Sequence, residues 1–274
     1  MILSLESEEK ALLKEARLRE TLKKMDSALI AYSGGVDSSY LALVATEELA
    51  DKAFCVMGIS PSVSRRQRVQ AEKIAKDFGF NYRVIETEEI NDSNYKSNPS
   101  NRCYFCKSEL YTKLRCIAEE LGVEYILDGS IVDDLSDFRP GRQAALENNV
   151  RSPLIEVGLK KQEIRFLSRR LGLYNWNEPS SPCLSSRIAY GLTITVERLG
   201  QVEKGEEILR QLGFREFRVR VHGELVRIEI SRAELEKIFD LEIFDYLSKR
   251  FHDIGFRYVT LDLEGYRSGS MNLK

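Results

Sequence analysis

The chain has 274 residues, of which 43% are hydrophobic and 31% are charged, and its formal net charge is −2. This composition is typical of a globular protein with one large or two modest domains, and it excludes a fibrous or disordered chain. Proteins that grip long nucleic acids by their phosphates are usually basic, so we do not expect DNA or RNA as the main partner.

The first part of the chain alternates between short apolar runs and helical patterns, after a charged amphipathic helix over residues 6–25. Buried strands are predicted at 28–33, 53–60, within 81–90 and at 124–130. Helices are predicted at 38–49, 62–78, 105–121 and near 160–171. Strands that alternate with helices indicate right-handed crossovers, so we expect an α/β fold with a parallel sheet and helices on both faces.

The pattern changes after residues 175–191, a loop rich in proline, serine and glycine. A helix over 194–212 is followed by two alternating strands in 216–230, which meet at a His-Gly turn and predict a hairpin. Two short helical stretches and a last strand complete a smaller α+β domain. We therefore expect two domains, 1–180 and 181–274.

No run of about 18 apolar residues is present, so no membrane-spanning helix is expected. The N-terminal segment is charged from its sixth residue and lacks the apolar core of a signal peptide. We therefore expect a cytoplasmic protein. Because the cytoplasm is reducing, the five cysteines should not form structural disulfides.

The stretch Ser-Gly-Gly-Val-Asp-Ser-Ser at 33–39 lies between a predicted strand and a predicted helix. The glycines permit a tight turn, and the helix directs free N–H groups and its positive dipole end at the same place. A carboxylate beside a polyphosphate fits if it holds Mg²⁺ or caps the helix. The lysine of a Walker A loop is absent. The candidate anion-binding residues are Ser33, Gly34, Gly35, Asp37, Ser38 and Ser39.

A second polar stretch follows the fourth predicted strand. Ligands of open α/β sheets bind outside the carboxyl ends of the strands, so this stretch should face the same crevice as residues 33–39. Arg139 has the fork geometry that holds a phosphate with two hydrogen bonds. The alternative is a solvated loop of charges. The residues concerned are Asp128, Gly129, Asp133, Asp137 and Arg139.

The cysteines suggest a metal centre. Cys103 and Cys106 form a Cys-x-x-Cys pair in a polar loop context, which alone indicates a metal-ligand pair, a redox dithiol or two incidental cysteines. Cys183 lies in a loop of the kind that carries chemistry. Three thiolates suit a 4Fe-4S cluster with one open iron, or zinc with a fourth ligand. We expect Cys55 and Cys116 in the core.

Basic residues alternate along the predicted hairpin. Because of this alternation, Arg218, Arg220 and Arg227 should share one face of the sheet. With His222 they predict a compact basic surface for a phosphorylated small substrate. The alternative is a solvated strand face.

Residues 33–39 resemble the PP-loop of the ATP pyrophosphatase superfamily. Those enzymes bind ATP, attack its α-phosphate with a substrate oxygen and release pyrophosphate. Over nearly its whole length the chain resembles the LarE family of ATP-dependent sulfur transferases, which act in the biosynthesis of a nickel-pincer nucleotide cofactor. The stretches that carry this resemblance are 33–39, 128–145, 179–191, 217–230 and 255–272.

The resemblance implies a substrate, cofactors and site residues. ATP, with Mg²⁺, would adenylate a carboxylate of pyridinium-3,5-biscarboxylic acid mononucleotide, and sulfur would convert it to a thiocarboxylate. Asp37 would be catalytic, and a homo-oligomer is expected. The implied ATP contacts include the backbone of Met57, Gly58 and Ile59 at the adenine, together with Gly129 and Arg139. The implied substrate contacts are Arg187, Glu206, Arg218 and Arg220.

The source of sulfur is left open by the resemblance. In one branch of the family a single cysteine donates its own sulfur and becomes dehydroalanine, and Cys183 matches that position. The additional Cys103 and Cys106 instead indicate a 4Fe-4S cluster on the three thiols, whose open iron carries a sulfide that attacks the acyl-adenylate. The alternatives are a tRNA thiolase, an amide-forming ligase of the NAD or GMP synthetase kind, or a nucleotide-binding or iron–sulfur sensor without turnover.

Overall fold

The computed structural model describes residues 4–135, 140–179 and 181–267. These residues form two compact units. The first unit comprises the described residues of Met1–Ser60, Arg65–Glu89 and Asn101–Ser181. The second unit comprises the described residues of Pro61–Ser64, Ile90–Ser100 and Pro182–Lys274.

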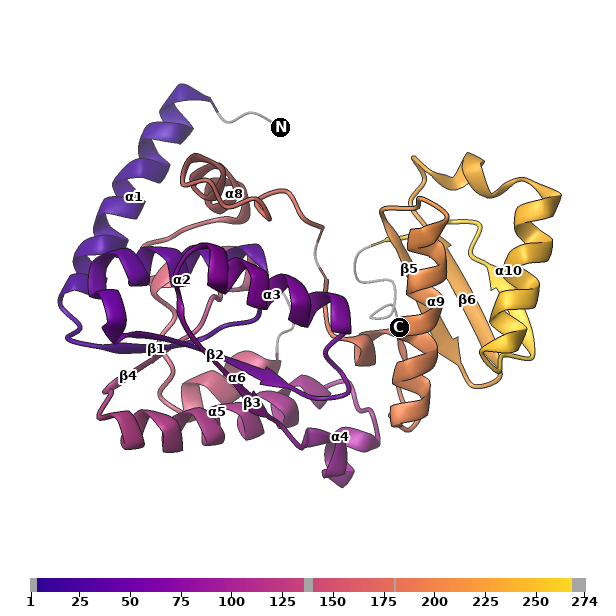
Figure 1. Cartoon of the computed structure of the whole chain (residues 1–274), viewed down its shortest axis with the longest axis horizontal. Coiled ribbons are helices and arrows are strands. Elements are labelled where there is room, and N and C mark those ends of the chain that lie inside the picture. The colour runs from indigo at the N-terminus through magenta and orange to yellow at the C-terminus, as the bar shows by residue number, and fades with distance from the viewer. Residues whose placement is uncertain (1–3, 136–139, 180, 268–274) are drawn as a thin grey trace. The chain divides into compact units, whose positions relative to one another are not determined.

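The first unit is built on a four-stranded, fully parallel sheet in the order β3-β2-β1-β4 (Figure 1). The strands are β1 (Ala28–Ala31), β2 (Ala53–Ile59), β3 (Asn81–Glu86) and β4 (Tyr125–Leu127). All four residues of β1 are buried, as expected of a central strand covered on both faces. The alternation of apolar runs and helices therefore predicted the sheet correctly, and the fold class is confirmed.

Helices cover both faces of this sheet (Figure 1). One layer contains α1 (Leu5–Lys23), α2 (Val36–Leu49), α3 (Arg65–Asp77) and α8 (Lys161–Arg170). The other contains α5 (Arg102–Leu121) and α6 (Pro140–Glu147). On this second face, Leu114 and Ile117 of α5 share a buried apolar cluster with Leu29 and Val56 of the sheet. Among the described residues, no helix is long and apolar enough to cross a membrane.

The second unit contains a small mixed sheet. The strands β5 (Phe217–His222) and β6 (Leu225–Ile230) are antiparallel, and β7 (Tyr258–Leu261) runs parallel to β6. The predicted hairpin is confirmed, but its turn is Gly223–Glu224, because His222 still pairs with Leu225 at the end of β5.

Two helices pack on this small sheet, α9 (Val196–Gln211) on β5 and α10 (Leu241–Asp253) on β7. A Cβ added at Gly205 of α9 would lie 2.8 Å from the Phe251 ring of α10 and 3.1 Å from Val219 of β5. Glycine is therefore needed where these elements meet.

Short helical segments complete the two units. The α-helical ones are α4 (Ser93–Lys96) and α7 (Pro153–Glu156). The 3-10 segments are Ala50–Lys52, Glu89–Asn91, Val132–Leu135, Leu184–Arg187 and Leu235–Ile238.

Two expectations about the cysteines need correction. The helix α5 begins at Arg102, so Cys103 and Cys106 lie in its first two turns rather than in a polar loop. Cys116 is exposed, not part of the core, because α5 turns its neighbours Leu114 and Ile117 toward the sheet and Cys116 away from it. Cys55 is buried in β2, as predicted.

Candidate active site

The turn between β1 and α2 is packed against α3. Gly34 has a positive φ of +76°, and a Cβ at this position would lie 2.6 Å from the Cβ of Ala71. Gly35 caps α2 with extended backbone geometry, and no side chain of this cap accepts a hydrogen bond from the first N–H groups of the helix. Ser33 and Gly35 are exposed, so the N–H groups at the start of α2 are available to an anion.

The serines of the loop have different environments. The Ser38 hydroxyl accepts from the Ser33 backbone N–H at 3.2 Å, lies 3.0 Å from the Ser33 hydroxyl and donates to the Gly35 carbonyl at 3.1 Å. Ser39 is fully buried, and its hydroxyl accepts from the Asn175 amide at 3.2 Å. Ser33 therefore presents its hydroxyl at the surface, whereas Ser39 supports the loop from within.

Two side-chain amides hold the carbonyl groups of this loop. The Gln67 amide of α3 donates to the Ser33 carbonyl at 3.0 Å, and the Asn175 amide donates to the Gly34 carbonyl at 3.2 Å. Asn175 is 1% exposed. Because these amides engage both carbonyls, the carbonyl oxygens of Ser33 and Gly34 are kept from a ligand, whereas the first N–H groups of α2 have no side-chain cap. Neither amide belongs to a motif that the sequence reveals.

Asp37 is paired with a lysine that no sequence motif indicated. The Lys161 ammonium of α8 donates to both carboxylate oxygens of Asp37, at 2.7 and 3.0 Å. Burial raises the pKa of the Asp37 carboxyl, while the positive charges of Lys161 and Arg165 act in the opposite direction. A carboxylate at the mouth of an anion-binding loop suits Mg²⁺, which proteins hold with one or two carboxylates and substrate phosphates.

The end of β4 meets the same loop. A Cβ added at Gly129 would lie 2.9 Å from the Ser38 backbone nitrogen, so the two segments are in direct contact. Asp133 accepts from the Lys161 backbone N–H at 3.0 Å, which brings this residue to the start of α8. Asp137 and Arg139 lie outside the described residues.

Asp128 itself is buried and satisfied within the protein. Its carboxylate accepts from the hydroxyls of Ser152 at 2.7 Å, Ser130 at 2.8 Å and Tyr111 at 3.2 Å. Burial raises the pKa of the Tyr111 hydroxyl to about 12, so it stays a donor at neutral pH. Asp128 therefore shapes the turn after β4.

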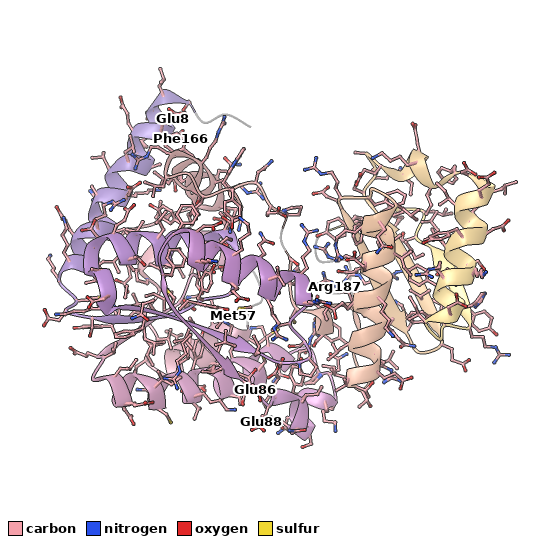
Figure 2. The ribbon with its side chains drawn as sticks, in the orientation of Figure 1. Glu8, Met57, Glu86, Glu88, Phe166 and Arg187 are labelled. Carbon is pink, nitrogen blue, oxygen red and sulfur yellow. The ribbon has the colours of Figure 1, made fainter. Side chains whose placement is uncertain are left out.

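The candidate adenine contacts lie at the end of β2. Met57 is 1% exposed within the sheet (Figure 2), and its sulfur accepts from the Tyr82 hydroxyl at 3.4 Å. A Cβ added at Gly58 would lie 2.7 Å from Leu110 of α5. A larger residue there would have to displace the Leu110 side chain, and the Gly58 backbone is the part of this residue that a ligand can contact.

The three candidate metal ligands belong to different units. Cys103 and Cys106 lie three residues apart on α5 in the first unit, a spacing that places both thiols on one side of the helix. Cys183 lies in the second unit, just before the 3-10 segment Leu184–Arg187. Cys103 is exposed and the other two are partly buried, and all are thiols rather than disulfides. Three thiols are a donor set that fits an iron–sulfur cluster. Among the described residues, the structure gathers no group of three metal-binding side chains.

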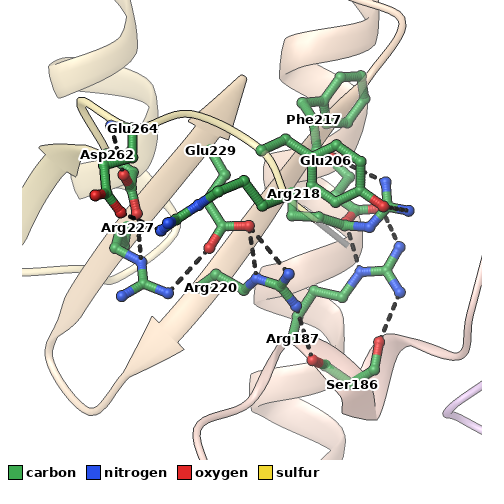
Figure 3. Close-up of polar contacts among 12 residues, drawn as sticks. Ser186, Arg187, Glu206, Phe217, Arg218, Arg220, Arg227, Glu229, Asp262 and Glu264 are labelled. Atoms are coloured by element: carbon green, nitrogen blue, oxygen red, sulfur yellow. Dashed lines mark hydrogen bonds and ion pairs between the residues drawn. The ribbon is translucent and has the colours of Figure 1, made fainter. Parts of the chain in front are cut away.

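Arg187 holds the backbone of the loop that contains Cys183. It is 2% exposed, and its guanidinium donates to Glu206 of α9 at 2.8 Å (Figure 3). The same group donates to the carbonyls of Pro182 at 2.6 Å and Cys183 at 3.1 Å. The position of Cys183 is therefore tied to α9 through one buried ion pair.

Further arginines continue this network on the hairpin (Figure 3). The buried Glu229 carboxylate accepts from Arg220 at 3.0 Å and from Arg227 at 2.9 Å. Arg218 lies over the Tyr266 ring, 4.5 Å from its centroid. Burial lowers the pKa of both Arg218 and Arg220.

The structure joins three of the four candidate substrate residues, Arg187, Glu206 and Arg220, through hydrogen bonds that include Ser186. The fourth, Arg218, lies on the same strand as Arg220 and donates to the Tyr266 hydroxyl at 3.2 Å. The predicted basic surface needs correction, however. Arg218 and Arg220 are only 8% and 6% exposed, because ion pairing and the Tyr266 ring cover them.

Comparisons with known proteins show the family to which the chain belongs. Residues 12–120 match the NAD synthase family. The chain is 37% identical over 261 residues to pyridinium-3,5-bisthiocarboxylic acid mononucleotide synthase of Lactiplantibacillus plantarum, covering 94% of each protein. The chain belongs to the LarE family of ATP-dependent sulfur transferases.

This LarE-family chain is also similar to other proteins. An uncharacterised protein of Synechocystis sp. is 45% identical over 255 residues, covering 93% of this chain and 95% of that protein. A glutamine-hydrolysing GMP synthase of Bacillus licheniformis is 26% identical over 243 residues, covering 81% of this chain and 43% of that protein. The resemblance to the LarE family that the motifs indicated is confirmed.

Proposed function

We propose that the chain adenylates a carboxylate of pyridinium-3,5-biscarboxylic acid mononucleotide with ATP and converts it to a thiocarboxylate. The observation that carries this proposal is the loop at 33–39, in which side-chain amides hold the carbonyls of Ser33 and Gly34, and which leads into the start of α2, where no side chain caps the N–H groups. The likeness to the Lactiplantibacillus plantarum synthase over 94% of the chain supports this substrate.

The chemistry requires activation because a carboxylate is a poor acyl donor, since its oxygen is a poor leaving group. A substrate carboxylate oxygen attacks the α-phosphorus of ATP, the bond to the β-phosphate oxygen breaks, and pyrophosphate leaves. A sulfur nucleophile then attacks the acyl carbon, and AMP departs with the electron pair of the broken C–O bond. N–H groups at the start of α2 stabilise the charge on the α-phosphate, and Asp37 would hold Mg²⁺.

The arginine network of the second unit supports a phosphate-binding role. A mononucleotide substrate carries a phosphate, and guanidinium groups hold phosphates with paired hydrogen bonds. Arg218 and Arg220 are preorganised by Tyr266 and Glu229, so little conformational entropy is lost when they bind. We assign substrate-phosphate binding to Arg218 and Arg220, and positioning of the Cys183 loop to Arg187 and Glu206.

The thiols of Cys103, Cys106 and Cys183 would hold a 4Fe-4S cluster. When bound, such a cluster supplies an iron with an open position for a sulfur ligand. The sacrificial use of Cys183 is the second candidate. It is favoured by the contacts of Arg187, which fix the Cys183 backbone without involving Cys103 or Cys106.

Anaerobic purification followed by iron, sulfide and product analysis tests these assignments. The variants are Cys103→Ala, Cys106→Ala and Cys183→Ala, with Cys116→Ala as the matched control on the same helix as the first two. We expect about four irons per chain in the native protein and in the control, lost in each of the other three. Thiocarboxylate formation should be lost with the iron.

Two outcomes would change the account. If Cys103→Ala and Cys106→Ala form product without iron while Cys183→Ala does not, Cys183 is the sacrificial donor. If the native protein releases no pyrophosphate with ATP and the pyridinium dicarboxylate, the proposed function is wrong.

A further inference from the structure

The loop at 33–39 lacks a positive charge for the phosphates it is proposed to bind. Its one charged residue is Asp37, which repels a polyphosphate. ATP carries several negative charges, and a phosphate site normally combines N–H groups with a cation. The cation must therefore come from elsewhere in the fold.

The helix α8 brings two cations to this loop. Lys161, the first residue of α8, places its ammonium 2.7 and 3.0 Å from the two Asp37 carboxylate oxygens. Arg165 follows one turn later on the same side of the helix. Among the described atoms, its buried Nε has no hydrogen-bond partner, although another nitrogen of the group donates to the Glu178 carbonyl at 3.3 Å.

The Lys161–Asp37 ion pair is too exposed for folding stability to be its only role. The side chains are 30% and 25% exposed, and partly exposed ion pairs add little to folding stability. Both groups also remain accessible to a ligand. A flexible four-carbon stem lets the Lys161 ammonium move by several ångströms without a change in the backbone.

We propose that Lys161 is the polyphosphate-binding cation of this site and that it changes partners when MgATP binds. Its ammonium would leave Asp37 for the β- and γ-phosphate oxygens, and Asp37 would take Mg²⁺ in its place. Each charge then has a partner before and after binding, so no carboxylate or ammonium is left uncompensated. Arg165 adds a second donor on the same side of α8. This inference rests on the proposed use of ATP.

Equilibrium titration of the full chain with nucleotides tests the proposal. The variants are Lys161→Met, which removes the charge, and Lys161→Arg, which keeps it. Lys160→Met removes the same charge from the exposed neighbouring residue and serves as the matched control. Each protein is titrated with MgATP and with AMP, which lacks the β- and γ-phosphates.

We expect Lys161→Met to weaken MgATP binding by about tenfold or more, as for a lost charge-assisted hydrogen bond. AMP binding should change by less than about twofold, Lys161→Arg should recover part of the MgATP affinity, and Lys160→Met should behave as the native chain. These results would support the exchange of partners.

Two results would overturn it. MgATP affinity unchanged in Lys161→Met would show that the lysine does not contact the phosphates. An equal loss for MgATP and AMP would show that Lys161 only supports the fold. The native chain tests the proposed function separately, because failure of the native protein to bind MgATP would count against ATP use itself.

Discussion

The ion pair between Arg187 and Glu206 provides a sharp test of how the Cys183 loop is held. Replacing Arg187 by methionine leaves the Glu206 carboxylate, 7% exposed, without its main partner. Breaking a buried ion pair in this way costs about 3–5 kcal/mol. The remaining cation, Arg210, lies 3.8 Å from Glu206 and compensates only in part.

A double variant separates the two parts of this cost. In Arg187→Met with Glu206→Leu, no buried charge is left over, and the loss of three hydrogen bonds remains, to the carbonyls of Pro182 and Cys183 and to the Ser186 hydroxyl. At about 1 kcal/mol for each hydrogen bond, the double variant should lose about 3 kcal/mol, whereas Arg187→Met alone also carries the cost of the uncompensated Glu206 charge. It should therefore be more stable than Arg187→Met alone.

Urea unfolding of both variants measures the differences in their free energy of unfolding. Hydrogen exchange, read by mass spectrometry, shows whether the destabilised segments are α9 and β5. Alkylation of Cys183, also read by mass spectrometry, should become severalfold faster in both variants because the loop loses its anchor. A loss below about 1 kcal/mol in Arg187→Met, or a double variant less stable than the single one, would refute the reasoning.

Three further predictions concern single side chains. Gly34→Ala should weaken ATP binding by about tenfold or more, because its Cβ would meet Ala71 at 2.6 Å and φ is +76°. Asn175→Asp should lower the free energy of unfolding by about 2–3 kcal/mol, because a carboxylate would face the Gly34 carbonyl to which the amide now donates. Burial and Arg227 lower the pKa of His222 below 6.5, so the unfolded state binds the proton more tightly. Stability should fall as pH drops through about 6.5, and less steeply in His222→Gln.

Each of these has a direct measurement. Nucleotide titration of Gly34→Ala contradicts the packing argument if the ATP affinity equals that of the native chain. Urea unfolding contradicts the role of Asn175 if the aspartate variant is as stable as the native protein. For His222, the free energy of unfolding is measured between about pH 7 and pH 5.5. If the stabilities of the native chain and of His222→Gln fall in parallel over this range, the predicted contribution of His222 is wrong.

The local features of the site were predictable from sequence because their residues are consecutive. The stretch at 33–39 carries its glycines, hydroxyls and carboxylate within one turn, and the alternation of apolar runs around it indicated the parallel sheet. Arg218 and Arg220 alternate on one strand, so their shared face was also predictable. Their burial was not, because it depends on Glu229 of the next strand and on the distant Tyr266.

The long-range contacts of the site could not be predicted in the same way. Lys161 lies 124 residues from Asp37, and Asn175 lies 141 residues from Gly34. Neither residue belongs to a pattern with its partner, and only the packing of α8 and the following loop against α2 brings them together. Cys116 illustrates a different limit of prediction from sequence. A cysteine is found at both buried and exposed helix positions, and the face of α5 on which Cys116 lies depends on where the helix begins.

The central claim is that ATP activates a carboxylate of the substrate, and oxygen labelling tests it most directly. The pyridinium dicarboxylate is prepared with ¹⁸O in its carboxylates, and the mass of the AMP released during turnover is measured by mass spectrometry. We predict one ¹⁸O atom in each AMP, because the carboxylate oxygen leaves with the α-phosphate. Unlabelled AMP, or formation of ADP in place of AMP and pyrophosphate, would contradict the account.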